Sequence, residues 1–276
     1  MAMEFKPFRL HYTAPDQHAA PRYAEQIEAA YEELSSNLGL QLAGTTDLFL
    51  CPTEELFNEL TGNLVPHWGE GVADPIHNLI VLKSPELTGN RQRFPRLVRH
   101  ELIHILVARA VRSPQSVPKW FSEGVAMFFS RDEEFASGKA ISKALLSDSV
   151  IPLDEIDDVL RFHSAKARLA YEESYSFTAF IEEQLGKGSL LRLIRELRQR
   201  PNFSEAFAQA LGVHLFDLEF EWMQYVAKKY RWRFFLDFET FLWIFVLFLF
   251  ILVVIRIRFR NRAVMKRWDE EEGMAE

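Results

Sequence analysis

The sequence holds a single cysteine, Cys51, which excludes an internal disulfide framework and a cysteine-rich metal site. Its neighbours in TDLFLC are apolar, so we expect a buried thiol on a strand. An excess of basic residues is also lacking: the formal net charge is −7. General nucleic-acid binding needs a cationic surface that displaces counterions, so nucleic acid is not expected as a partner. No internal repeat interrupts the chain.

Apolar residues, in contrast, are plentiful. Of 276 residues, 48% are hydrophobic and 26% are charged, a balance typical of a globular chain. This length is enough for one or two domains with a hydrophobic core.

Residues 240–255, TFLWIFVLFLFILVVI, form a run without charge, Gly or Pro. A bilayer span needs about 20 apolar residues, and the following RIRF extends the run if Arg256 and Arg258 reach toward headgroups. Trp243 and Trp268 suit the two interfacial zones. A buried core helix is the alternative, but a helix that is apolar all round is typical of a membrane span. We therefore predict one transmembrane helix over 240–259, followed by a charged tail over 260–276.

Two features of the sequence favour opposite orientations of this span in the membrane. The N-terminus has no apolar stretch that resembles a signal peptide, which favours a cytosolic location for residues 1 to about 235. The basic residues weakly favour a cytoplasmic tail instead, because four precede the span and six follow it: Lys228, Lys229, Arg231 and Arg233 before; Arg256, Arg258, Arg260, Arg262, Lys266 and Arg267 after. We expect a single-pass membrane protein and lean slightly to the cytosolic side.

Residues 1–230 are predicted to form an α+β domain whose first part, 1–92, is mainly α/β. Strands are expected at 6–13, 47–51 and 79–82, helices at 21–38 and after Thr53, and a loop at 69–78. Residues 93–230 are mainly helical, with expected helices at 93–111, from about 120, and at 153–162, 170–185, 188–198, 203–211 and 216–230.

HELIH, residues 100–104, lies on the expected 93–111 helix. Residues four apart share a helix face, so His100 and His104 can direct two ring nitrogens at one ion. Glu101 projects about 100° round the helix, where its carboxylate can take a proton from water beside the ion. The alternative is that the two histidines bind no metal and make ordinary hydrogen bonds. The apolar residues around the motif favour a metal, because burying two histidines and a glutamate without one is costly.

A catalytic zinc ion usually has three protein ligands. The next helix, PKWFSEGVAMFF over 118–129, offers Glu123 one turn from its start. Without a partner, this carboxylate would be an isolated charge among apolar residues. Gly124 and Ala126 are small enough to let the two helices approach closely.

HELIH followed by PKWFSEGVAMF resembles the gluzincin branch of the zincin metallopeptidases, the peptidase MA-like group, and the similarity extends from about residue 45 to 225. NLIVL at 78–82 is similar to the edge strand that aligns substrate in zincins. The resemblance implies a zincin-like fold, with a small mixed-sheet subdomain and a helical one. It also implies Zn²⁺ held by His100, His104 and Glu123, with Glu101 as general base.

One position departs from the family pattern. Thermolysin-like gluzincins carry an acid four residues after the ligand Glu, where it supports a zinc-bound histidine, and this chain has Met127 there. YEESYSFTAFIEEQLG, 171–186, resembles the later helix of the group. The match makes Tyr171 the candidate donor to the oxyanion, with Tyr175 as second choice. A core tyrosine is an equally good interpretation of each.

The sequence thus predicts a membrane-anchored zinc metallopeptidase that acts on a peptide or protein substrate, with the lipid bilayer as a second partner. A catalytically inactive zincin-like domain that binds or senses a partner at the membrane is the main alternative. A weaker one is a membrane-tethered helical domain in which HELIH binds nothing.

Overall fold

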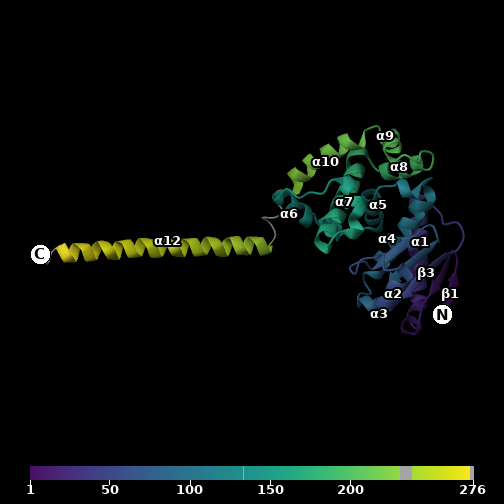
Figure 1. Cartoon of the computed structure of the whole chain (residues 1–276), viewed down its shortest axis with the longest axis horizontal. Helices are drawn as coiled ribbons and strands as arrows, with labels where there is room; N and C mark the ends of the chain where they lie inside the picture. Colours follow the sequence, from purple (N-terminus) through teal and green to yellow (C-terminus); the bar gives the residue numbers. More distant parts are fainter. Residues whose placement is uncertain (133, 231–237, 274–276) are drawn as a thin grey trace.

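The computed structural model describes residues 1–132, 134–230 and 238–273 (Figure 1). Its N-terminal part is built on a five-stranded mixed sheet in the order β1-β2-β3-β5-β4. The expected strand at 6–13 is instead a hairpin of β1, Ala2–Phe5, and β2, Phe8–His11. The parallel strands β2, β3 (Thr46–Cys51) and β5 (Leu79–Lys83) follow the predicted βαβαβ order.

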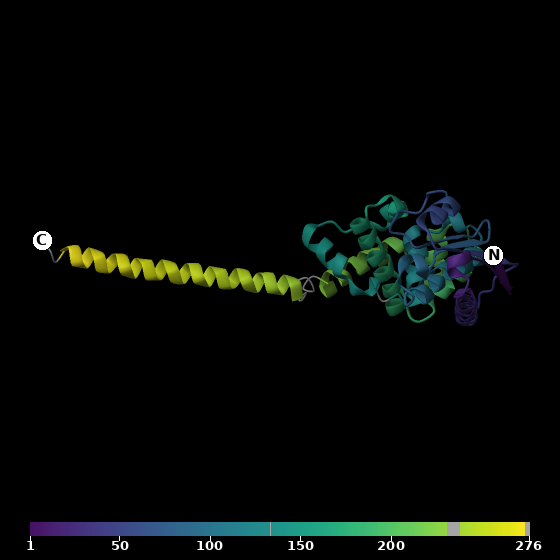
Figure 2. The same ribbon diagram turned by 90° about the horizontal axis from the view of Figure 1, so that it is seen from below.

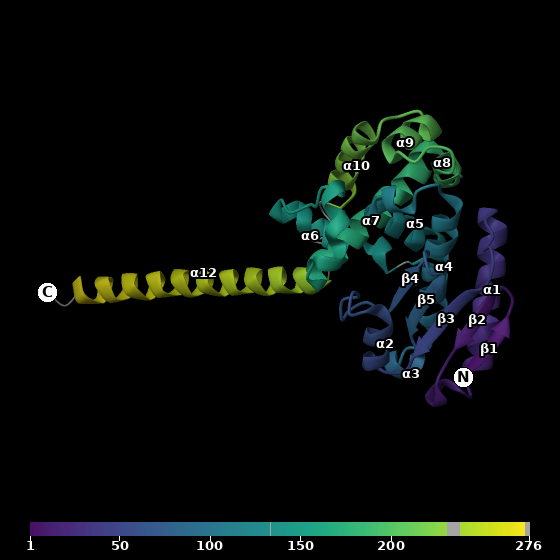
Figure 3. The ribbon, with the colours of Figure 1, turned by 45° about the vertical axis from the view of Figure 1, so that its right-hand side comes forward.

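The alternation of side chains along β3 explains why both faces of the sheet are covered. Leu48 and Leu50 face the main core, which includes α1, Ala20–Leu38, and α4, Phe94–Ala110. Cys51 faces α2, Glu54–Thr61, and packs with Phe57 and Val81. Figure 3 shows α1 and α2 on opposite sides of the strands. The prediction of a buried thiol is confirmed, and burial raises the pKa of Cys51 to about 12.

The edge strand beside the helical part differs from the expectation. β5 was expected to be this edge but is internal, with β3 and β4 on its two sides. β4, Gly71–Asp74, lies within the 69–78 segment that was predicted as a loop. The prediction was wrong because Gly, Asp and Pro weaken the strand signal of this segment, whereas antiparallel pairing with the following strand, β5, stabilises it as a strand.

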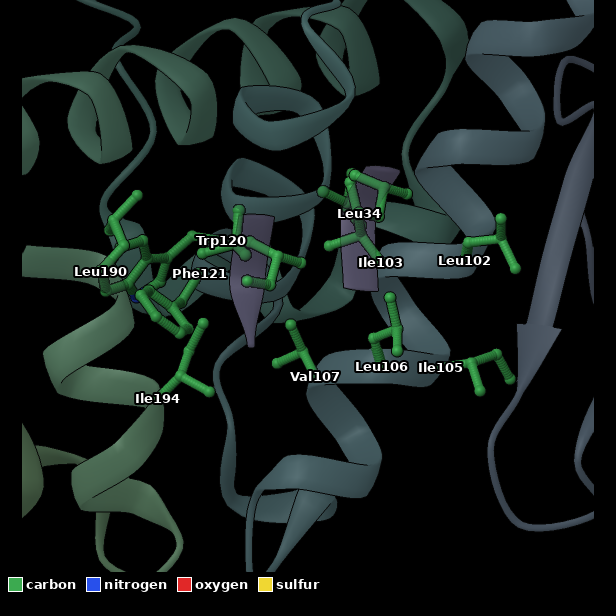
Figure 4. Close-up of a cluster of buried hydrophobic side chains, with 14 of the residues drawn as sticks. Leu34, Leu102, Ile103, Ile105, Leu106, Val107, Trp120, Phe121, Leu190 and Ile194 are labelled. Carbon is green, nitrogen blue, oxygen red and sulfur yellow. The ribbon is translucent and has the colours of Figure 1, made fainter. Parts of the chain in front are cut away.

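The second half is mainly helical, as predicted. α5, Lys119–Ser130, packs against α4 and against α7, Ser164–Leu185. Figure 4 shows apolar side chains of α4 and α5 meeting those of α8. The predicted helix at 153–162 is a 3-10 helix, η4 at Leu153–Arg161, and α6, Lys139–Ser147, was not predicted. The remaining helices are η1 Ala14–Asp16, α3 Pro85–Thr88, η2 Pro114–Ser116, η3 Phe135–Ser137, α8 Ser189–Leu197, α9 Phe203–Leu211 and α10 Leu215–Tyr230.

Gly124 permits a close helix approach, but to a different partner from the expected one. A Cβ atom at Gly124 would lie 2.5 Å from the carbonyl oxygen of Ser174 and would also collide with Oγ1 of Thr178. Both residues belong to α7, so the glycine allows α5 to approach α7 and not α4.

The main core is continuous across the predicted boundary near residue 92. Leu34 and Leu48 belong to the same buried cluster as Ile103 and Phe121. That residues 1–92 and 93–230 form two subdomains stays a prediction.

The C-terminal helix α12 runs over Phe238–Gly273 (Figure 2). It contains a segment of 22 residues, Phe241–Arg262, that is long and apolar enough to cross a membrane, and none of it is buried. The helix continues through most of the predicted charged tail. The described residues thus form a mixed, mostly helical α+β structure with one apolar C-terminal helix, as predicted.

Candidate metal centre

A cleft of about 870 Å³ lies where the free edge of β4 meets the helical part. α4 provides one side of it, from Arg93 at its start to Arg109 near its end. β4, α5 and α7 supply further lining residues, including Gly71, Glu123 and Tyr171. The cleft thus gathers His100, Glu101, His104, Glu123 and Tyr171, which the sequence singled out.

Three side chains in this cleft converge on one point. Nε2 of His100 and Nε2 of His104 are 3.1 Å apart. Oε2 of Glu123 lies 3.4 Å from the first nitrogen and 3.5 Å from the second. The histidines come from successive turns of α4 and the glutamate from the first turns of α5.

This triangle fits a tetrahedral zinc ion. Ligand atoms at about 2.0–2.1 Å from zinc are about 3.3–3.4 Å from one another in a tetrahedron. The three edges, 3.1, 3.4 and 3.5 Å, straddle that value. Two imidazoles and one carboxylate also make up a ligand set found in catalytic zinc sites. The residues therefore fit the ion that the sequence implies.

The electrostatics of the cluster favour an ionised carboxylate. Burial opposes the charge of Glu123, but the positive charge of His104 and hydrogen bonds from both histidines hold the pKa of Glu123 well below its ordinary value. Burial also opposes protonation of His100. Its hydrogen bond to Glu123 and the charge of Glu101 outweigh that effect and raise the pKa of His100.

Glu101 is 5% exposed, although it borders the cleft. Burial raises its pKa, and the neighbouring charges of His100 and His104 only partly offset this. Gly71 on β4 lies directly beside it, since a Cβ atom there would be 2.7 Å from Oε1 of Glu101. The sequence did not indicate this role of Gly71, because it depends on the pairing of β4.

Ser122 is another site residue that the sequence analysis missed. Nδ1 of His104 lies 3.0 Å from Oγ of Ser122, on α5. Met127, at the position of the missing family acid, is fully buried. Asp132 follows the end of α5, where it accepts a bond from Arg96 at 3.1 Å, and its charge contributes to the raised pKa of His100. The signal that could have identified Ser122 is its position directly before Glu123 in the sequence.

Of the two candidate tyrosines, Tyr171 is the one that lines the cleft. Its ring contacts Trp68 at 5.9 Å and Phe135 at 5.4 Å between centroids. Burial raises the pKa of Tyr171 well above its ordinary value, and the charges of Glu123 and Glu101 act in the same direction. The hydroxyl therefore keeps its proton at neutral pH. Tyr175, on the same helix, is not among the cleft-lining residues.

Comparison with curated proteins gives no match. The model of the Peptidase MA superfamily matches residues 28–228, from within α1 to near the end of α10. This match covers the whole cleft and well over half of the chain, and it confirms the resemblance seen in HELIH and PKWFSEGVAMF. The chain therefore belongs to the Peptidase MA superfamily.

Proposed function

We propose that the protein is a membrane-anchored, zinc-dependent metallopeptidase with a gluzincin-type, zincin-like fold. The observation that carries this proposal is the triangle of His100, His104 and Glu123, with edges of 3.1, 3.4 and 3.5 Å, beside the buried carboxylate of Glu101. The superfamily match supports the same class of activity.

His100, His104 and Glu123 would hold the zinc ion, and Ser122 would fix the ring of His104 through Nδ1. When bound, zinc supplies a Lewis acid that polarises a peptide carbonyl and makes water more acidic. The ionised state of Glu123 suits a ligand, since a carboxylate binds zinc in its charged form.

Glu101 would act as the general base. Its raised pKa brings the carboxylate closer to the pH at which proton transfer is efficient. Glu101 takes one proton from water and later gives it to the leaving amine. The oxygen of that water forms the new C–O bond, and the peptide C–N bond breaks. Tyr171, which keeps its proton, would donate a hydrogen bond to the carbonyl oxygen as negative charge develops there.

The free edge of β4 would align the substrate backbone. β4 ends the sheet next to the cleft, and Gly71, Val72 and Ala73 line the cleft. An extended peptide can add to such an edge through main-chain hydrogen bonds. The sequence analysis expected the substrate-aligning edge strand at 78–82, and we assign this role to β4 instead. A peptide or protein substrate is the partner that this arrangement supports.

α12 would anchor the protein in a bilayer. Its apolar segment of 22 residues spans about 33 Å as a helix, against a hydrocarbon core of about 30 Å. The expectation that residues 1 to about 235 face the cytosol stays a prediction.

The test is zinc content and peptide hydrolysis of the full chain, purified in detergent without added metal. We expect about one zinc ion per chain and hydrolysis of peptides in the wild type. His104→Ala should lose the metal and the hydrolysis. Glu101→Gln should keep the metal and lose the hydrolysis, because the substitution removes the general base and leaves the three metal ligands in place. Retained hydrolysis in Glu101→Gln would refute the general-base assignment, and unchanged metal in His104→Ala would refute the ligand assignment.

The alternative is a non-catalytic zincin-like domain that binds or senses a partner at the membrane. The presence of Glu101 in a buried position beside the ligand triangle argues against it, because binding alone needs no base. If zinc is present, no peptide is hydrolysed and Glu101→Gln changes only binding, the alternative is correct.

A further inference from the structure

The two ends of the cleft differ. Arg93, Arg96 and Leu97 line the end near the start of α4, and Ala108 and Arg109 line the end near its last turn. Arg93 precedes His100 by two helical turns, or about 10 Å. An extended peptide rises about 3.3 Å per residue, so about three residues fit between the ligand triangle and that first end.

Ion pairs connect the two sides of the cleft at this first end. Glu70, just before β4, lies 3.2 Å from Nε of Arg93. Nη2 of Arg93 lies 3.6 Å from Glu134, which in turn lies 3.2 Å from Nη1 of Arg168 on α7. The chain of pairs thus runs from the sheet to α7. The ring contact between Trp68 and Tyr171 links the same two sides. The end is therefore closed by side chains.

The arginines at this end remain more accessible than their acidic partners. The side chains of Arg93, Arg96 and Arg168 are 39%, 40% and 43% exposed. Those of their partners Glu70, Asp132, Glu134 and Glu172 are only 25%, 10%, 34% and 0% exposed. A guanidinium has five N–H donors, and the contacts of Arg168 with Glu134 and Glu172 engage three of them, one each on Nε, Nη1 and Nη2. All three arginines line the cleft together with Glu70, Asp132 and Glu134, and the guanidinium groups are the more exposed members of these ion pairs.

We propose that this arginine end, formed by Arg93, Arg96 and Arg168, binds the C-terminal carboxylate of a peptide substrate. The inference rests on the proposed peptidase function and names its substrate class: peptides with a free C-terminus, cleaved at most about three residues from it. Guanidinium groups bind carboxylates through paired, charge-assisted hydrogen bonds.

The direction of β4 identifies which end of the peptide lies there. β4 runs from Gly71, next to Glu70 and hence to Arg93, toward Asp74. A peptide that adds antiparallel to its free edge runs the opposite way and brings its C-terminal part to Arg93.

The opposite end of the cleft can accommodate the N-terminal part of the substrate peptide. Ile76, which follows the end of β4, lines the cleft and is 76% exposed, and Leu160 is a second exposed apolar lining residue, at 44%. Among the ion pairs of the described residues, none joins β4 to the helices at this end: Lys119 pairs within α5, with Glu123 at 3.9 Å. The peptide therefore leaves the cleft on the side that no such pair closes.

The experiment uses the full chain in detergent and a randomised library of peptides of about ten residues. An extended peptide of this length is about 33 Å long and therefore exceeds the distance along the cleft from Arg93 to Arg109, which is about 24 Å. One half of the library has a free C-terminal carboxylate and the other a C-terminal amide. Mass spectrometry reads the cleavage positions, and kcat/KM is then measured on matched pairs. We expect cleavage within about three residues of the C-terminus. The kcat/KM for the free acid should exceed that for the amide about tenfold to a hundredfold, which is the effect expected from one charge-assisted hydrogen bond.

Two arginine variants separate recognition from folding. Arg168→Gln should bring the ratio of acid to amide rates close to one. Arg200→Gln is the matched control, because Arg200 forms an (i,i+4) pair with Glu196 and is 41% exposed, but does not line the cleft. It should keep the ratio of the wild type. If Arg168→Gln is misfolded, Arg168→Lys, which keeps the charge but not the paired donors, should give an intermediate ratio.

Binding provides a readout without turnover. Fluorescent peptides with a free C-terminus should bind the Glu101→Gln variant more tightly than their amides do. Equal rates on acid and amide, or dependence on a free amino terminus, would overturn the inference while the peptidase function stands. No hydrolysis of any peptide by the zinc-loaded wild type, together with no binding to Glu101→Gln, would overturn both.

Discussion

Gly71 on β4 faces the carboxylate of Glu101 at a distance that leaves no room for a side chain. A Cβ atom at Gly71 would lie 2.7 Å from Oε1 and 3.1 Å from Cδ of Glu101, and 2.9 Å from Cδ2 of Leu82. The backbone at Gly71 is not left-handed, so an alanine there would meet no backbone strain but would force the side chains of Glu101 and Leu82 to shift. The edge strand therefore sets the position of the carboxylate.

Gly71→Ala should displace Glu101 while leaving the ligand triangle intact. Because a shift of about 1 Å in a catalytic group lowers rates by up to about a hundredfold, we expect kcat to fall about tenfold to a hundredfold at unchanged zinc content. Gly69→Ala is the comparison variant: its Cβ would lie 2.4 Å from Cγ1 of Val65, so it introduces a clash in the same segment of the cleft wall without touching Glu101. Unchanged kcat in Gly71→Ala would show that Glu101 has room to move without loss.

Ser122→Ala should weaken the hold on the metal without abolishing it. The hydroxyl lies 3.0 Å from Nδ1 of His104, and loss of such a partner typically lowers metal affinity about tenfold to a hundredfold. Zinc affinity is measured by competition with a chelator of known strength. Ser130→Ala, on the same helix but bonded to the carbonyl of Met127, should keep the affinity of the wild type. Equal affinity in both variants would assign the orientation of His104 to packing alone.

The parts of the site that the sequence predicted correctly depend on local periodicity. The helix expected at 93–111 is α4 at Phe94–Ala110, and its spacing puts His100 and His104 on one face. The convergence of Glu123 with them was also predicted, because the short loop after α4 leaves few ways to place α5. Zinc binding by these three residues stays a prediction.

The parts that the sequence missed depend on how each element pairs or packs with its neighbours. β4 has no strong strand signal of its own and exists because it pairs with β5. Gly71 is needed only because Glu101 lies beside it, and Gly124 faces α7 rather than α4 because of how the three helices pack. Helical spacing does not carry this information, since β4 is decided by its partner strand and the two glycines by residues on helices thirty or more positions away.

Gly124→Ala should destabilise the protein although alanine is the better helix former. In an unobstructed helix this change would stabilise by about 1 kcal/mol. Here the added Cβ would collide with α7, at 2.5 Å from the carbonyl oxygen of Ser174, so α5 and α7 must move apart. We expect a net loss of about 1–3 kcal/mol in the free energy of unfolding, measured by urea titration. A gain would mean that the two helices separate without loss of packing.

Glu173 on α7 should make stability depend on pH. Its side chain is fully buried, Oε1 accepts a hydrogen bond from the backbone of Ile151 at 3.2 Å, and Oε2 has no partner. Burial raises the pKa of Glu173 from 4.5 to about 8. Between these two values the folded protein keeps a proton that the unfolded chain releases. The free energy of unfolding should therefore fall by up to about 1.4 kcal/mol for each unit of rising pH in this window.

Glu173→Gln isolates this contribution, because glutamine does not titrate and its carbonyl can still accept the bond from Ile151. Urea titrations of both proteins at several pH values give the difference in their free energies of unfolding. Contributions from all other groups, the metal ligands included, cancel in that difference. We expect the wild type to lose stability relative to Glu173→Gln as pH rises from about 4.5 to about 8, and the difference to level off beyond that range. A difference that is constant with pH would mean that Glu173 is ionised in the folded protein, and that its charge is stabilised by more than the bond to Ile151.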